Sequence, residues 1–122
     1  MKRSVLLIGH GSKLSGSSDS LLQVVDALRT NDPETIFHAA FLEIASPNIP
    51  DGIELCLSQD ADEVVVVPYF VQAGRHVVED IPRFVNSAQA KHPTKTIRLA
   101  SYLGFDERIV SLVADRVSQA RR

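Results

Sequence analysis

Three side chains of this sequence combine metal-binding with proton-transfer chemistry: His10, Glu43 and His76. Neutral imidazole and carboxylate groups bind first-row divalent metals such as Co²⁺, Ni²⁺, Fe²⁺ or Zn²⁺. An imidazole is also the usual general base near neutral pH. Three protein ligands leave coordination positions open, as in a working site rather than a structural one. The sequence contains no HExxH motif and no pair of cysteines, so only the fold can bring these three residues together.

Four apolar runs predict the strands that position these side chains. The run at 64–67 consists of four valines, so we expect it to be buried on both faces of a parallel sheet. Glu43 directly follows one of the other runs, His10 lies two residues past another, and His76 lies in the loop that follows the valines. The four predicted strands are Val5–Ile8, Ile36–Leu42, Val64–Val67 and Ile97–Ala100.

A helical pattern follows each predicted strand. The third helix is expected over Ile81–Lys91, with Pro82 in its first turn, where a missing N–H is harmless. The last helix is amphipathic, and we expect its apolar side chains to point inward: Ile109, Val110, Leu112, Val113 and Val117. The predicted N-caps of the four helices are Ser18 or Asp19, Asn48 or Asp51, Asp80, and Asp106.

Alternating strands and helices with short connections predict an α/β fold with a parallel sheet and helices on both faces. In such a sheet every strand ends at the same edge, which is where ligands bind. This edge therefore collects His10, Glu43, His76 and the loop at 102–104.

Length and composition limit the remaining possibilities. The 122 residues predict a single domain, 1–122, and a net charge of −2 gives no general attraction to nucleic acid or membranes. The lone Cys56 cannot form an internal disulfide or hold an iron–sulfur cluster, and we expect it in the core. The first apolar run is too short for a signal peptide, and no run is long enough for a membrane span. We expect a cytoplasmic protein.

A set of motifs in this order resembles the small sirohydrochlorin chelatases, which are similar to one half of the longer class II cobaltochelatases and ferrochelatases. The resemblance extends from Val5 to the last helix. The HGS turn alone is a weak signal, but the ordered set is highly specific. The motifs are LLIGHGS (6–12), FLE (41–43) with Pro47, VVPYFVQAGRH (66–76), DIP (80–82) and LG (103–104).

The resemblance implies a flavodoxin-like three-layer sandwich with a four-stranded parallel sheet. It implies a lyase that inserts a divalent metal into sirohydrochlorin during cobalamin or sirohaem biosynthesis. Co²⁺ is the first choice, with Fe²⁺ or Ni²⁺ as alternatives and no organic cofactor. His10 and His76 would bind the metal or take pyrrole protons, with Glu43 as the third member. The resemblance also implies a homodimer.

Six further residues are expected to bind the substrate. Sirohydrochlorin carries many carboxylates, which Ser12, Lys13 and Arg75 would bind together with N–H groups at helix starts. Gly74 would allow either a positive φ or a close approach of the ligand. Tyr69 and Phe70 would shape the pocket.

Two other functions remain open at this stage. A protein that carries or senses a metal could use His10 and His76 without catalysis. A phosphoryl-transfer enzyme of the histidine-phosphatase kind also has a strand-end His-Gly turn, but Gly9 here replaces the arginine that would clamp a phosphate. For the assembly, the alternative to a homodimer is an open monomer that grips the macrocycle from one side.

Overall fold

The computed structural model describes residues 2–11 and 19–120, apart from the side chain of His76. Four parallel strands form one sheet in the order β2-β1-β3-β4. This arrangement confirms the α/β fold and the parallel sheet predicted from the sequence. The strands begin and end within two residues of the predicted bounds and are β1 (Arg3–Gly9), β2 (Ile36–Phe41), β3 (Glu63–Pro68) and β4 (Thr96–Leu99).

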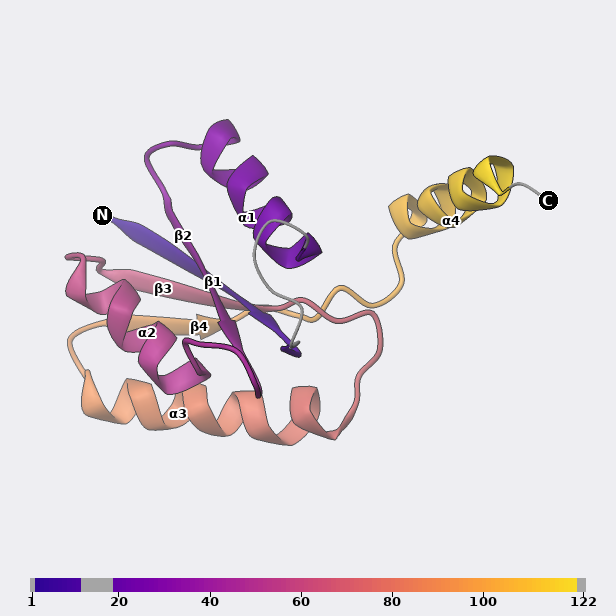
Figure 1. Ribbon diagram of the computed structural model, residues 1–122. Coiled ribbons are helices and arrows are strands. Elements are labelled where there is room, and N and C mark those ends of the chain that lie inside the picture. The colour runs from indigo at the N-terminus through magenta and orange to yellow at the C-terminus, as the bar shows by residue number, and fades with distance from the viewer. Residues whose placement is uncertain (1, 12–18, 121–122) are drawn as a thin grey trace.

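Helices cover both faces of the sheet. Helix α1 (Ser20–Asn31) packs on one face over β1 and β2, whereas α2 (Ile49–Ser58) and α3 (Ile81–Lys91) pack on the other (Figure 1). Asp19 and Asn48 cap α1 and α2, as predicted, because each side chain accepts a hydrogen bond from a backbone N–H of the first turn. These three layers are the predicted sandwich.

The alternation of side chains along the strands divides the core into two clusters. Leu6, Ile8 and Val66 belong to the larger cluster, under α2 and α3, where Cys56 is also fully buried, as predicted. Burial raises the pKa of the Cys56 thiol. Leu7 and Phe41 belong to the smaller cluster, under α1. The larger part of the hydrophobic core thus lies between the sheet and the helices α2 and α3.

The entry into α3 differs from the prediction. A five-residue π-helix, η2 (His76–Asp80), runs directly into α3, so His76 begins a helical turn rather than lying in a loop. Asp80 is helical (φ −76°, ψ −45°) and its side chain caps no backbone N–H. Its carboxylate instead lies 3.2 Å from the guanidinium of Arg83, three residues along. Capping is unnecessary here because η2 already precedes α3 without a break.

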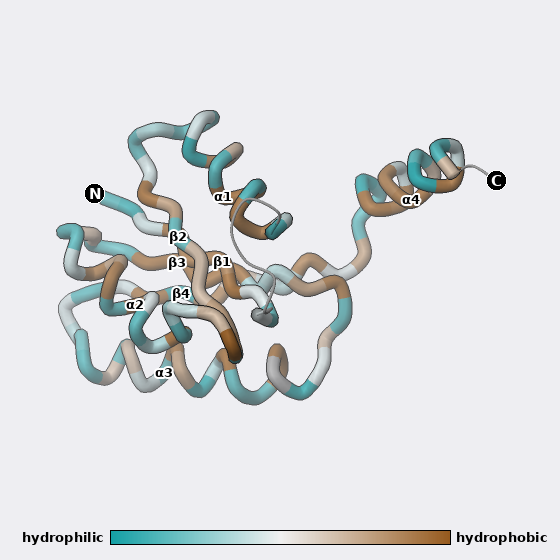
Figure 2. The backbone as a smooth tube through the Cα atoms, in the orientation of Figure 1, coloured by the Kyte–Doolittle hydropathy of each residue, from teal (hydrophilic) through white to brown (hydrophobic). Residues whose placement is uncertain are grey.

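The last helix, α4 (Glu107–Gln119), contradicts the prediction that its apolar side chains point inward. Asp106 caps it as expected, but no residue of α4 is buried. Figure 1 shows α4 standing away from the sheet at the end of an extended connection. The amphipathic spacing predicted the helix and its apolar side correctly, but it could not predict what that side contacts. Apolar and hydrophilic stretches alternate along α4 in Figure 2.

The position of α4 also changes the environment of β3. Val64 and Val66 are fully buried, whereas Val65 and Val67 on the opposite face of β3 are only partly buried. The predicted burial of the valine run on both faces is therefore wrong for one face. The reason is that α1 lies mainly over β1 and β2, so Val67 packs against the cluster under α1 but stays only partly buried.

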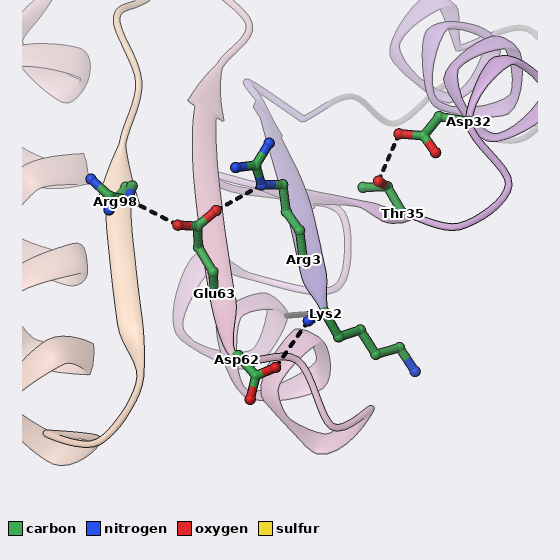
Figure 3. Close-up of polar contacts among 7 residues, drawn as sticks. All are labelled: Lys2, Arg3, Asp32, Thr35, Asp62, Glu63 and Arg98. Atoms are coloured by element: carbon green, nitrogen blue, oxygen red, sulfur yellow. Dashed lines mark hydrogen bonds and ion pairs between the residues drawn. The ribbon is translucent and has the colours of Figure 1, made fainter.

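A charged triplet crosses this open face. The buried carboxylate of Glu63 on β3 lies 2.7 Å from the guanidinium of Arg3 on β1 and 2.9 Å from that of Arg98 on β4 (Figure 3). The hydrogen bonds from Arg98 and Arg3 lower the pKa of Glu63. The triplet therefore ties β4 to the amino-terminal ends of β1 and β3.

Among residues 2–11 and 19–120, no helix is long and apolar enough to cross a membrane.

Candidate functional site

His10 and Glu43 meet at the carboxyl edge of the sheet. His10 directly follows β1, and Glu43 lies two residues past β2, the neighbouring strand. The two loops continue the pairing of the strands, because the N–H of Glu43 donates a hydrogen bond of 3.2 Å to the carbonyl of His10. Nε2 of His10 lies 3.0 Å from Oε1 of Glu43. Their side chains are 60% and 55% exposed, so the pair is open to a ligand.

Gly11 makes this close approach of the two loops possible. Its φ of 105° is one that L side chains rarely adopt. A Cβ on Gly11 would overlap the backbone carbonyl of Glu43. Only glycine therefore fits at position 11, where the backbone next to His10 lies against the backbone of Glu43.

A hollow of about 250 Å³ opens beside His10. Tyr69 and Phe70, which directly follow β3, contribute to its wall from one side, and Leu21 and Phe41 contribute from the other. The hydrogen bond of 2.9 Å from the N–H of Tyr69 to the carbonyl of Ile8 holds the segment after β3 against the end of β1. The hollow therefore combines these apolar and aromatic side chains with the imidazole of His10 and with two polar residues, Asp19 and Ser20.

The segment from Gly74 to Glu79 lies past the end of β3. A side chain at Gly74 would meet no atom within 4 Å, and its φ is not in the left-handed region, so of the two roles expected for this glycine only the close approach of a ligand remains. The side chain of Arg75 is 83% exposed, and its guanidinium lies 3.8 Å from the carboxylate of Glu79. The backbone of His76 begins η2.

Of the three predicted metal ligands, the structure brings the side chains of His10 and Glu43 together. Within the described part of the chain, no three histidine, cysteine, aspartate or glutamate side chains lie together as a metal site. Ser12 and Lys13, expected to bind the substrate, lie outside the described residues.

Comparison with known proteins shows the family of this chain. Residues 4–120 match the CbiX family. The chain belongs to the CbiX family.

Two curated relatives and one solved structure show which proteins this chain is similar to. The chain is 32% identical to the sirohydrochlorin cobaltochelatase of Methanosarcina barkeri, over 98% of this chain and 97% of the relative. It is 29% identical to the sirohydrochlorin ferrochelatase of Priestia megaterium, over 95% of this chain and 44% of the relative. The solved structure is the sirohydrochlorin chelatase SirB from Bacillus subtilis subspecies spizizenii in complex with cobalt. It matches with a TM-score of 0.86 and 28% identity, over 97% of this chain and 50% of that one. The chain thus spans about half the length of some relatives and nearly all of another.

The role of Gly11 in the site could not be predicted from the sequence. The residue stood only as part of a turn around His10, although a glycine on each side of a histidine was a signal that the backbone must take an unusual path there. The atom that excludes a side chain at Gly11 is the carbonyl oxygen of Glu43, which is 32 residues away in the sequence. The need for glycine is therefore visible only once β1 and β2 are paired.

Proposed function

We propose that this chain is a sirohydrochlorin chelatase that inserts a divalent metal, Co²⁺ first and Fe²⁺ or Ni²⁺ as alternatives, into the macrocycle. The observation that carries the proposal is the contact between His10 and Glu43 on an open sheet edge of a CbiX-family chain. The relatives named as sirohydrochlorin cobaltochelatase and ferrochelatase support this substrate and these metals.

The pairing of His10 with Glu43 suits both tasks of metal insertion. When the carboxylate of Glu43 accepts a hydrogen bond from Nε2–H of His10, it fixes the tautomer whose Nδ1 carries the lone pair. That nitrogen is then available to bind the incoming metal or to take a pyrrole proton. An imidazolium formed by proton uptake remains stabilised by the carboxylate 3.0 Å away. His76, from the neighbouring strand end, would serve as the further donor in this proposal.

The site must also release what it binds. Insertion exchanges two pyrrole protons for one M²⁺, so the ion must leave its protein ligands within each cycle. A few imidazole and carboxylate donors on an exposed edge permit this transfer, whereas a closed four-ligand site would retain the ion. The exposure of His10 and Glu43 fits such a transient site.

We assign the substrate's flat apolar surface to Tyr69 and Phe70, beside His10. Its carboxylates would be bound by Arg75, and by Ser12 and Lys13. Gly74 leaves open space through which the macrocycle can approach the backbone. The lone buried Cys56 fits the reducing cytoplasm as the place of action.

We further propose that the active form is a homodimer. Small-molecule sites usually bury most of the ligand's surface. A hollow of about 250 Å³ on one open edge is small for a tetrapyrrole. Two edges facing each other across a two-fold axis would enclose the macrocycle and supply two pairs of His10 and Glu43, which matches the two protons that must leave.

The proposal is tested by incubating the purified chain anaerobically with sirohydrochlorin and Co²⁺, Fe²⁺ or Ni²⁺ in turn, with absorbance as the readout. We expect many macrocycles to be metallated per chain, faster than without protein, for at least one metal. The alternative of a metal-delivery protein predicts stoichiometric metal binding with no acceleration. That result would contradict the proposed activity.

A further inference from the structure

We propose that Ile44 is a further substrate-binding residue, which a strained turn holds at the carboxyl edge of the sheet so that its apolar side chain packs against the macrocycle beside His10 and Glu43. The inference rests on the sirohydrochlorin site proposed above and adds to it a residue that does not touch the metal. Binding of the macrocycle alone can therefore test it.

The first observation is the backbone conformation of Ile44. Its φ is 71°, in the left-handed region, where a β-branched residue is an outlier. The N–H of Ala45 donates a hydrogen bond of 2.7 Å to the carbonyl of Glu43, so residues 43–45 form a γ-turn with Ile44 at its centre. A γ-turn with a positive φ at its centre is rare and strained, and strained residues cluster at active sites and ligand clamps.

The turn is held in this conformation from both ends. On one side, the N–H of Glu43 donates a hydrogen bond to the carbonyl of His10, and the carbonyl of Glu43 occupies the space beside Gly11. On the other side, Ala45 packs against the hydrophobic cluster under α1. The contacts of its two neighbours therefore fix the backbone of Ile44.

The second observation is the exposure of this side chain. Ile44 is 63% exposed, so it contributes little to the core. Glycine or asparagine would adopt the same φ at a lower cost. Neither the backbone nor the core thus explains why an isoleucine stands at this position, whereas a contact with a ligand does.

The third observation is the place of Ile44 relative to the imidazole. Strand β1, which His10 follows, lies between β2 and β3. Ile44 is three residues past β2, and Val71, which is 53% exposed, is three residues past β3. Neighbouring strands are about 4.8 Å apart, so the ends of β2 and β3 flank His10 across a span on the order of 10 Å. A flat tetrapyrrole laid on His10 extends across such a span and meets exposed apolar residues on both sides.

The chemistry of Ile44 determines which kinetic constant it affects. An aliphatic side chain cannot bind the metal or transfer a proton, but it gains free energy when the apolar ring covers it. This contact is the same before and during metal insertion. Ile44 should therefore lower the KM for sirohydrochlorin and leave kcat unchanged.

Titration of the metal-free protein with sirohydrochlorin, followed by absorbance, tests this role in two variants. Ile44→Asn accepts the positive φ but loses the apolar surface, so the Kd should rise about tenfold. Its thermal midpoint should also rise, by about 4 °C, because the strain is relieved. Ile44→Leu keeps the apolar surface and should bind within about twofold of wild type.

Asp60→Asn is the matched control. Among the described residues, Asp60 is the only other non-glycine residue with a positive φ, at 61°. It lies between α2 and β3, at the opposite edge of the sheet from His10. This variant should bind sirohydrochlorin within about twofold of wild type.

Three results for Ile44→Asn would overturn the inference. The first is binding as tight as wild type, or a loss of kcat at unchanged KM. The second is a lower thermal midpoint than wild type, because the isoleucine would then serve the fold. The third is a monomer in light scattering where wild type is a dimer, because the side chain would then contact a second copy.

Metallation by wild type is measured separately, which distinguishes this inference from the proposed activity. A wild type that binds sirohydrochlorin without metallating it would contradict the activity, and the Kd of Ile44→Asn would still decide the role of Ile44. A wild type that does not bind sirohydrochlorin would overturn both. Tighter folding of Ile44→Asn together with weaker binding of the macrocycle is the result that we expect.

Discussion

Gly11→Ala should disable the site while leaving both reactive side chains in the sequence. The new Cβ overlaps the backbone carbonyl of Glu43, and the φ of 105° is strained for alanine. Strain of this kind costs about 1–3 kcal/mol. The loops after β1 and β2 must separate, which breaks the hydrogen bond of 3.2 Å from Glu43 to His10 and the side-chain contact of 3.0 Å. Because misplacement by roughly 1 Å can cost about 100-fold in rate, we expect a loss of that order in metallation.

Two further glycine substitutions serve as controls for Gly11→Ala. Gly52→Ala places a Cβ 2.8 Å from that of Ala40 in the core, so it should also destabilise the fold by about 1–3 kcal/mol, but with near-normal turnover of the folded protein. Gly74→Ala meets open space, so it is a control for stability alone and should change the free energy of unfolding by less than about 0.5 kcal/mol.

Denaturant unfolding followed by circular dichroism gives the stabilities, and absorbance gives the rates. Wild-type stability and turnover of Gly11→Ala would contradict the role assigned to Gly11. An equal loss of activity in Gly52→Ala at the same loss of stability would also contradict it, because the effect would then not depend on the site.

The remaining predictions concern three titratable side chains. His76→Ala should lower the metallation rate at least about tenfold, as for a lost acid–base group, and a wild-type rate would remove His76 from the mechanism. Glu43→Gln keeps the shape of the hydrogen bond but removes the charge, so metallation measured across pH should be slower with an altered acid limb, and an unchanged profile would make Glu43 a surface residue. Hydrogen bonds from Arg98 and Arg3 hold the pKa of Glu63 below its ordinary value of 4.5, so its contribution to stability is complete above that pH and is lost as the pH falls through the folded-state pKa. Thermal unfolding should therefore show Glu63→Gln less stable than wild type at pH 7, with the difference closing below pH 4.5, and a difference independent of pH would contradict this assignment.

The strands and their order along the chain could be predicted because each depends on local composition. The valine run of β3 and the apolar run of β1 are strands whatever surrounds them, and alternation with helices imposes a parallel sheet. The meeting of His10 and Glu43 at one edge then follows from topology, even though they are 33 residues apart.

The features that could not be predicted depend on contacts between distant segments. The apolar stripe of α4 is visible in the sequence, but the sequence does not say whether it covers its own sheet or another surface. Aspartate often caps helices, but the π-helix η2 runs into α3 without a break, so Asp80 has no free helix start to cap. The need for Gly11 arises from one backbone carbonyl that lies in another loop.

The most direct test of the central claim is the rate of Co²⁺ insertion into sirohydrochlorin by wild type and His10→Ala under anaerobic conditions. His38→Ala is the matched control, because His38 lies within β2 and its Nε2 contacts Gln59 at 2.7 Å instead of the site. We expect His10→Ala to be slower than wild type by at least about tenfold, and His38→Ala to match wild type. Equal rates for wild type and His10→Ala would contradict the claim that the strand-end pair of His10 and Glu43 carries the reaction.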